Sequence, residues 1–453
     1  MGFLDQIYTI LGLNKGGGQA KKKRGKQSFT PTGMDQGGAG VVLLAELEGA
    51  RGAADGLAEI LEETDNLVID RVTRPVKLPA GGTLAQRLTV AADVGRKLLS
   101  NSDGDLLVFG EGGEDGMALR FVQAKPSADG SGFGLGDVLE LPLSLDGDLA
   151  AIFRAVTVAA LSPGRDRGRY VDLQVQTTDR IGNLVAQPPV GLNDRQTSSL
   201  LVALGHVCAL RAKTEKRGGD AWANRSTEAY SKAASLLDPS GNPLQWAIAK
   251  THHATALLAS GEAARDDGLQ EQAAAAFREI ATHLNAEEYP TDWALAQTRL
   301  GSTLYKLAAR NGDTKQLKEA AGAFEAAMTI QTRDAAAAAW AEIMNQYGVC
   351  LLALGQQVQG TKILDQSAAA FRAALEVRRR ETLPLLWAQT ANNLGAAAFA
   401  LSKRGGAESL LAEAEACFEG AREVFLENGK ARMVSVIDKN LDRVRARIAK
   451  KAT

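Results

Sequence analysis

A tryptophan recurs every 47 residues through the second half of this 453-residue chain. An aromatic ring stands sixteen residues before each tryptophan, and a small residue stands eight residues after it. A fixed period of this length is typical of repeat proteins, in which each unit is a small group of helices stacked on the next. We therefore expect an array of helix pairs over this half of the chain. The tryptophans are Trp246, Trp293, Trp340 and Trp387.

Each repeated residue has a physical reason. The ring lies among alanines, which let the next helix pack closely, and we expect tryptophan to fill the space between successive pairs. A proline three residues before three of the four tryptophans predicts the start of the first helix. Amide hydrogens in the first turn of a helix have no partner within the helix, and proline has no amide hydrogen to leave unpaired. Glycines are expected to end the first helices. These glycines are Gly261, Gly312, Gly355 and the pair Gly405–Gly406.

This pattern, together with the Asn-Asn-Leu-Gly of Asn392–Gly395, resembles the long tetratricopeptide repeats of bacterial regulatory proteins. The resemblance covers about Ser198 to Ile448, and the repeat domain is expected to span residues 198–453. Val434 replaces tryptophan in a charged final helix that would cap the array. The resemblance implies a superhelix whose first helices line a groove for a protein partner. It places these residues near that groove: Thr251, Thr298, Arg299, Asn345, Gln346, Asn392 and Asn393. The alternative is that these positions are simply solvated.

Histidines and cysteines do not indicate a metal site or disulfides. His252 and His253 are adjacent, so on a helix they point about 100° apart, and we expect one to pack and the other to be exposed. Cys208, Cys350 and Cys417 are odd in number and far apart, which favours free thiols in packed helices and a reducing compartment.

Residues 41–163 alternate apolar runs with helical spacing, which predicts an α/β region with a parallel or mixed sheet. The succession resembles the TolB-like modules that precede helical repeats in some bacterial regulators. The resemblance implies that this region recognises a ligand or a protein. It gives no catalytic residue that could be assigned to a position of this chain. Strands are expected at Val41–Leu47, Leu67–Val72, Asp105–Gly110, Met117–Ala124 and Val138–Leu145, with helices at Thr83–Leu99 and Leu149–Leu161. Residues 164–197 are expected to be a connection with a short strand at Tyr170–Val175.

Two features of this region leave an alternative function open. The α/β region could be a regulatory domain that senses a nucleotide or a metal ion, or an enzymatic domain. The repeats would then serve for oligomerisation or for binding a partner. Gly110, Gly112 and Gly113 follow a strand, but a phosphate-binding loop must run into a helix, so a hairpin turn is favoured. Glu46, Glu48 and Asp55 could form an acidic metal site at the edge of the sheet. They could equally be solvated loop charges.

Residues 1–26 differ from the rest, with a net charge of +5 against −6 for the remainder. Their apolar residues share one face of a short helix, which a basic cluster follows, so we expect a tether to an anionic membrane surface or to a partner. The alternative is a solvated tail. The tether residues are Phe3, Leu4, Ile7, Tyr8, Leu11, Lys21, Lys22, Lys23 and Arg24, and residues 27–40 are expected to be a flexible linker.

A net charge of −1 excludes the basic footprint of a dedicated nucleic-acid binder. No apolar run approaches the roughly 20 residues that cross a bilayer, and no histidine precedes His206, so histidine chemistry is not expected in the α/β region. The sequence predicts a cytoplasmic, non-catalytic scaffold that binds a protein partner, with peripheral attachment to the inner membrane as an additional expectation. No cofactor and no metal are expected, and a homo-oligomer stays open.

Overall fold

The computed structural model describes residues 39–125, 133–145, 147–161, 167–179, 181–215, 218–405, 407 and 409–452. Residues 1–38 lie outside the described residues, and so do the predicted tether and almost all of the predicted linker. In the described part of the chain, no helix is both long and apolar enough to cross a membrane.

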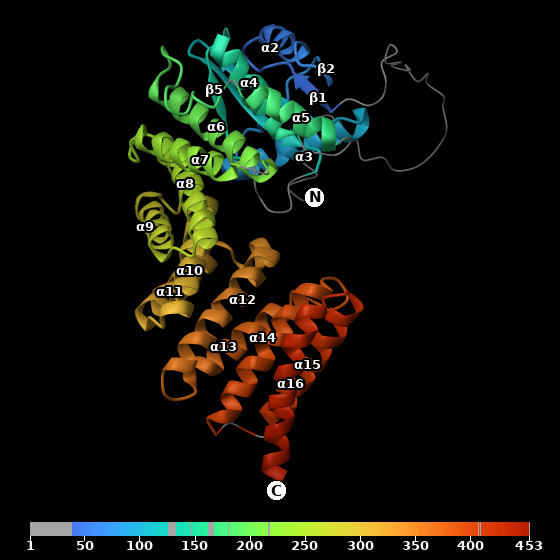
Figure 1. The fold of residues 1–453 in the computed structure, drawn as a ribbon, viewed down its shortest axis with the longest axis vertical. Helices are drawn as coiled ribbons and strands as arrows, with labels where there is room; N and C mark the ends of the chain where they lie inside the picture. Colours follow the sequence, from blue (N-terminus) through green and yellow to red (C-terminus); the bar gives the residue numbers. More distant parts are fainter. Residues whose placement is uncertain are drawn as a thin grey trace, which may run out of the picture. The chain divides into compact units, whose positions relative to one another are not determined.

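The described chain begins with a five-stranded mixed sheet of order β2-β1-β3-β4-β5 (Figure 1). The first three strands are parallel, and β4 and β5 are each antiparallel to the strand before them. The elements are β1 (Gly40–Ala45), α2 (Ala53–Glu62), β2 (Leu67–Val72), α3 (Leu84–Ser102), β3 (Leu106–Gly113), β4 (Gly116–Gln123), β5 (Leu139–Leu141), α4 (Gly147–Ala160) and α5 (Arg167–Thr178). The prediction of an α/β region is confirmed.

Alternation of side chains along β1 gives the sheet two buried faces. Leu43 and Ala45 pack with α3 on one face. Val42 and Leu44 pack on the other face, in a core that α2 and α4 also enter. Helices therefore cover the sheet on both sides, as parallel strands require.

The predicted strand at Tyr170–Val175 is wrong, because this segment lies inside α5. Tyr170, Leu173 and Gln174 are all buried, and their spacing of three and four residues belongs to one face of a helix. The Tyr170 hydroxyl also donates to the Leu161 carbonyl at 3.2 Å, which ties α5 to the end of α4.

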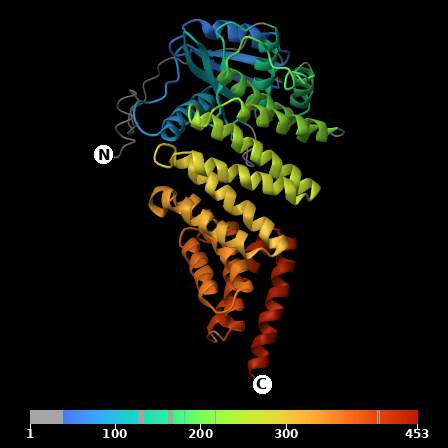
Figure 2. The same cartoon turned by 90° about the vertical axis from the view of Figure 1, so that its left-hand side faces the viewer.

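Eleven further helices follow in the described part of the chain, as five antiparallel pairs and a final helix, α16, that packs on α15. Figure 2 shows those from α8 to α16 lying in succession. They are α6 (Asp194–Thr214), α7 (Gly219–Ser235), α8 (Pro243–Ala264), α9 (Asp267–His283), α10 (Pro290–Asn311), α11 (Thr314–Ile330), α12 (Arg333–Gln357), α13 (Lys362–Leu375), α14 (Pro384–Lys403), α15 (Ser409–Glu427) and α16 (Ala431–Ala452). The fold is thus an α/β region followed by an all-α array of helical repeats.

The ring of each second helix packs directly on the small residue of its first helix. A Cβ atom added at Gly348 would stand 2.7 Å from the Phe371 ring, and one at Gly395 would stand 3.0 Å from the Phe418 ring. Both rings are at most 1% exposed. Glycine permits this close approach in these two repeats, and the first repeat has alanine, the next smallest residue, at the same position. The packing therefore explains the small residue eight positions after tryptophan.

The tryptophans contribute less to the interior than the sequence analysis expected. Trp246 is 4% exposed, but Trp293, Trp340 and Trp387 are only partly buried. Arg333 lies over the Trp340 ring, and Arg380, 47 residues later, lies over the Trp387 ring. Phenylalanine rather than tryptophan is therefore the fully enclosed ring of the repeat.

Proline begins three first helices, as predicted, and the third repeat keeps the same bend without it. Ala336 in α12 has φ −152° and ψ 63°. The residues that precede Pro243, Pro290 and Pro384 have nearly the same angles, with φ between −124° and −136° and ψ between 55° and 58°. Packing of the pair therefore imposes this bend, and proline only favours it.

The expectation that Gly261 and Gly355 end their helices is wrong. Gly261 lies inside α8, which is capped by Arg265 at φ 55°, and Gly355 lies inside α12. A Cβ atom at Gly355 would meet Leu364 at 2.7 Å, so a small residue is needed there for close packing. Gly312 does cap α10, at φ 74°.

The three cysteines are free, and they lie in packed helices as predicted. Burial raises the pKa of Cys208 and the pKa of Cys350 to about 12, and that of Cys417 to about 11. The thiols are therefore protonated near neutral pH.

The hydrophobic core of the sheet continues into the first helices of the array. One cluster contains Val42 of β1, Phe153 of α4, Leu204 of α6, Tyr230 of α7 and Ala249 of α8. The core does not stop at the predicted boundary between residues 163 and 164. Helix α6 accordingly begins before residue 198, where the repeats were expected to begin.

Candidate functional site

The seven residues predicted to face a partner all lie on first helices of successive pairs. Arg299 is exposed, Asn345 is buried at 4% exposure, and the other five are partly buried. Thr251 is on α8, Thr298 and Arg299 on α10, Asn345 and Gln346 on α12, and Asn392 and Asn393 on α14. Whether they contact a partner stays a prediction.

Hydrogen bonds join this polar column from one repeat to the next. The Asn393 amide donates to Oδ1 of Asn345 at 3.2 Å, linking α14 to α12. Ser302 of α10 donates to the Gln346 side chain, linking α10 to α12. These two hydrogen bonds, which we call the polar strip, link the first helices α10, α12 and α14 of three repeats.

One of the seven predicted residues has a side-chain acceptor without a hydrogen-bond partner among the described residues. The Asn392 amide nitrogen lies 3.4 Å from Oδ1 of Asn393, but its own Oδ1 is buried and accepts no bond. An unsatisfied buried acceptor costs about 1–3 kcal/mol, so this oxygen lowers the stability of the packing around it.

Among the described residues, neither of the two alternatives considered for this region, the phosphate loop or the acidic metal site, forms. Gly113 pairs with Gly116 across the β3–β4 hairpin, so the favoured hairpin interpretation is confirmed. The three carboxylates are used separately. Oε1 of Glu46 accepts from the Gly52 amide at 2.7 Å, Oε1 of Glu48 accepts from Nζ of Lys77 at 2.6 Å, and Asp55 pairs with Arg71.

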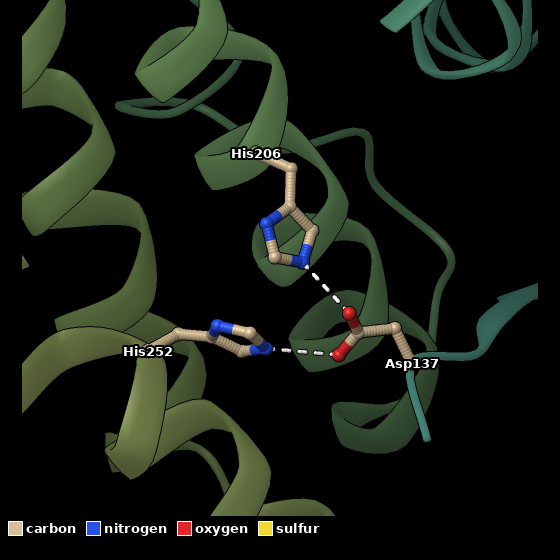
Figure 3. Close-up of side chains that lie close together, drawn as sticks. All are labelled: Asp137, His206 and His252. Carbon is tan, nitrogen blue, oxygen red and sulfur yellow. Dashed lines mark hydrogen bonds and ion pairs between the residues drawn. The ribbon is translucent and has the colours of Figure 1, made fainter. Parts of the chain in front are cut away.

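The structure brings together a cluster that the sequence analysis missed: Asp137, His206 and His252 (Figure 3). Nε2 of His206 lies 3.1 Å from Oδ2 of Asp137, and Nε2 of His252 lies 2.9 Å from Oδ1. Asp137 precedes β5, and the histidines come from α6 and α8. The cluster thus joins the α/β region to the first two helix pairs. Among the described residues, no other group of three or more such side chains could hold a metal ion.

Burial and hydrogen bonding fix the members of the cluster. The side chains of Asp137 and His206 are 5% and 4% exposed, whereas His252 is 25% exposed. Burial acts to raise the pKa of Asp137, but the two imidazoles outweigh it and hold that pKa well below its usual range. Burial lowers the pKa of His206, against the attraction of Asp137. The carboxylate is therefore charged at neutral pH.

Aromatic rings enclose the cluster. The Tyr230 hydroxyl lies 2.9 Å from Nδ1 of His206, and its ring stacks on His252 with centroids 5.2 Å apart. The Phe133 ring lies 4.7 Å from that of His206. The Gly134 amide donates to Oδ2 of Asp137 at 2.6 Å. Two imidazole nitrogens and a carboxylate oxygen in such a shell can act as hydrogen-bonding groups or as metal ligands.

Sequence reasoning missed this cluster because its members are far apart in the chain. Asp137 and His206 are 69 residues apart, and Asp137 and His252 are 115 apart. The available signal was the scarcity of histidine, since the chain has four. His253 lies outside the cluster, and both adjacent histidines are partly buried, so the expectation that one of them is exposed is wrong.

No protein-family profile and no curated protein sequence matches this chain. The apo form of RapI is similar over 63% of this chain and 94% of its own, at 11% identity and a TM-score of 0.36. A Rap protein complexed with competence and sporulation factor is similar over 67% of this chain and 77% of its own, at 12% identity and a TM-score of 0.31. Similarities this low carry no functional argument, so function must be inferred from the residues themselves.

Proposed function

We propose that this protein is a non-catalytic scaffold that binds an extended segment of a protein partner along the first helices of its repeats. The observation that supports the proposal best is the hydrogen-bonded polar strip at Ser302, Gln346, Asn345 and Asn393. Both hydrogen bonds join first helices that are one repeat apart.

The chemistry of the strip suits a polypeptide backbone. Each amide side chain offers two N–H donors and a carbonyl acceptor, the same groups that an extended peptide presents along its length. Arg299, which is exposed, adds a positive charge that would favour an acidic side chain on the partner.

Two further contacts belong to the same proposal. The α/β region, by its resemblance to TolB-like modules, would provide a second recognition surface beside the repeats. Residues 1–26 would tether the scaffold in the cytoplasm to the anionic inner face of a membrane through their apolar stripe and basic cluster.

Site-specific photo-crosslinking tests the binding surface. We expect a crosslinking amino acid at Thr298 or at Gln346 to capture one and the same partner. The same group at Gln366 of α13 or Lys318 of α11 should not capture it, because these exposed control positions lie on second helices. Equal capture from the control positions, or capture from them alone, would place the binding surface elsewhere.

A further inference from the structure

We propose that Asp137, His206 and His252 together bind one divalent transition-metal ion, of which zinc fits the donor set best. The proposal is independent of partner binding by the repeats. The three donor atoms lie within 4.8 Å of one another and come from three separate segments, the loop before β5, α6 and α8 (Figure 3).

The separations suit a shared ion. Ligand atoms about 2.0–2.2 Å from a tetrahedral zinc ion lie roughly 3.3 Å from each other. The two oxygen–nitrogen distances of the cluster, 3.1 Å and 2.9 Å, are within a few tenths of an ångström of that value. His252 is the most exposed member, so it has the most freedom to turn toward an ion and provides the side from which the ion can enter.

The charge of the cluster also favours a cation. The Asp137 side chain is only 5% exposed, so little water remains to solvate its carboxylate. Arg120 of β4 is a cation that interacts with Asp137, but Glu111 and Glu140 attract it more strongly. A divalent ion would compensate the carboxylate directly, which buried charges require.

The surrounding residues are placed as outer-shell partners of metal ligands usually are. A metal-bound imidazole must present an unprotonated Nε2, so His206 would carry its proton on Nδ1. That nitrogen lies 2.9 Å from the Tyr230 hydroxyl, whose oxygen can accept the bond. The Gly134 amide orients the carboxylate from the other side.

The donor types narrow the choice of ion. Imidazole nitrogens favour zinc and the neighbouring first-row ions over magnesium and calcium, which prefer oxygen ligands. Three protein ligands leave a fourth position for water. Because the ligands belong to both the sheet region and the first repeats, the ion would also hold these parts together.

Zinc binding by the untagged full-length chain, after removal of metal with a chelator, tests the proposal. Competition with a chromogenic chelator should give one high-affinity site per chain. Cobalt should give the visible absorption of a four-coordinate ion, and zinc should raise the melting temperature until one equivalent has been added.

Matched variants identify the ligands. His252→Ala should weaken zinc binding by more than about 100-fold, since loss of an outer-shell partner alone costs about 10–100-fold. Tyr230→Phe should weaken it by about tenfold. His253→Ala, one residue away on the same helix, should keep the wild-type affinity. His252→Gln provides a second test if the alanine variant unfolds, as judged by circular dichroism.

Failure of the folded wild-type chain to bind zinc would overturn the proposal. Equal zinc affinity in the His252 and His253 variants would also overturn it. In either case the cluster would be a hydrogen-bonded anchor only, and partner binding by the repeats would be unaffected.

Discussion

Replacing Phe371 with alanine is expected to lower the free energy of unfolding by about 3–5 kcal/mol. The ring is 0% exposed and packs on Gly348, where a Cβ atom would come within 2.7 Å of it. A glycine has no side chain to move into the space that the ring leaves. The cavity would therefore persist, and the transfer and cavity costs would add.

Trp340→Ala provides the comparison for this prediction. Trp340 belongs to the same repeat but is only partly buried, so its loss should cost no more than about 2 kcal/mol. Urea unfolding followed by circular dichroism measures both variants. A larger loss for Trp340 than for Phe371 would show that tryptophan, not the ring on glycine, provides the main stabilising contact.

Arg378→Ala is expected to have the second largest effect, a loss of about 2–4 kcal/mol. Arg378 is 2% exposed although it is charged, and its Nη1 donates to the Thr390 hydroxyl at 2.9 Å. It also pairs with Glu342 of α12, so it joins two consecutive repeats. Its truncation would leave a cavity and remove both contacts.

Arg379, the residue that follows Arg378 in the chain, provides a control for this prediction. Arg379 is exposed, so Arg379→Ala should change the free energy of unfolding by no more than about 0.5 kcal/mol. Thermal and urea unfolding of both variants compare a buried arginine with an exposed one at neighbouring positions. Equal effects would mean that the burial of Arg378 contributes nothing to stability.

The repeat half of the fold could be predicted because its information is periodic. A period of 47 residues repeats each packing requirement, so the ring of Phe371 and the glycine at Gly348 could be found without any structure. The same period aligns Ala336 with the residues before the three prolines. The backbone bend at Ala336 is therefore indicated by its position in the repeat. The sheet could be predicted because its strands are short apolar runs separated by helical spacing.

The remainder depends on contacts that no local pattern encodes. The neighbouring helix pair determines how far each tryptophan side chain is buried. The burial of Arg378 depends on its contacts with Glu342 and Thr390. Asp137 meets its histidines only because the core of the sheet continues into the repeats. The short segment at Tyr170–Val175 has a strand-like composition, but its buried residues follow a helical spacing that packing against α4 selects.

The binding surface is tested most directly by the affinity for the crosslinked partner. Gln346→Arg and Thr298→Arg alter partly exposed members of the predicted surface, and Gln366→Arg makes the same change on a second helix. Asn345 is unsuitable, because at 4% exposure its substitution would also disturb packing. All three variants should melt within about 2 °C of the wild type, since they alter exposed or partly exposed side chains.

The measurement is the Kd of each variant for that partner. We expect arginine at residue 346 or 298 to weaken binding at least about tenfold, equivalent to about 1.4 kcal/mol. Arginine at residue 366 should leave the Kd unchanged. An unchanged Kd for both first-helix variants would contradict the proposal that the first helices of the repeats bind the partner.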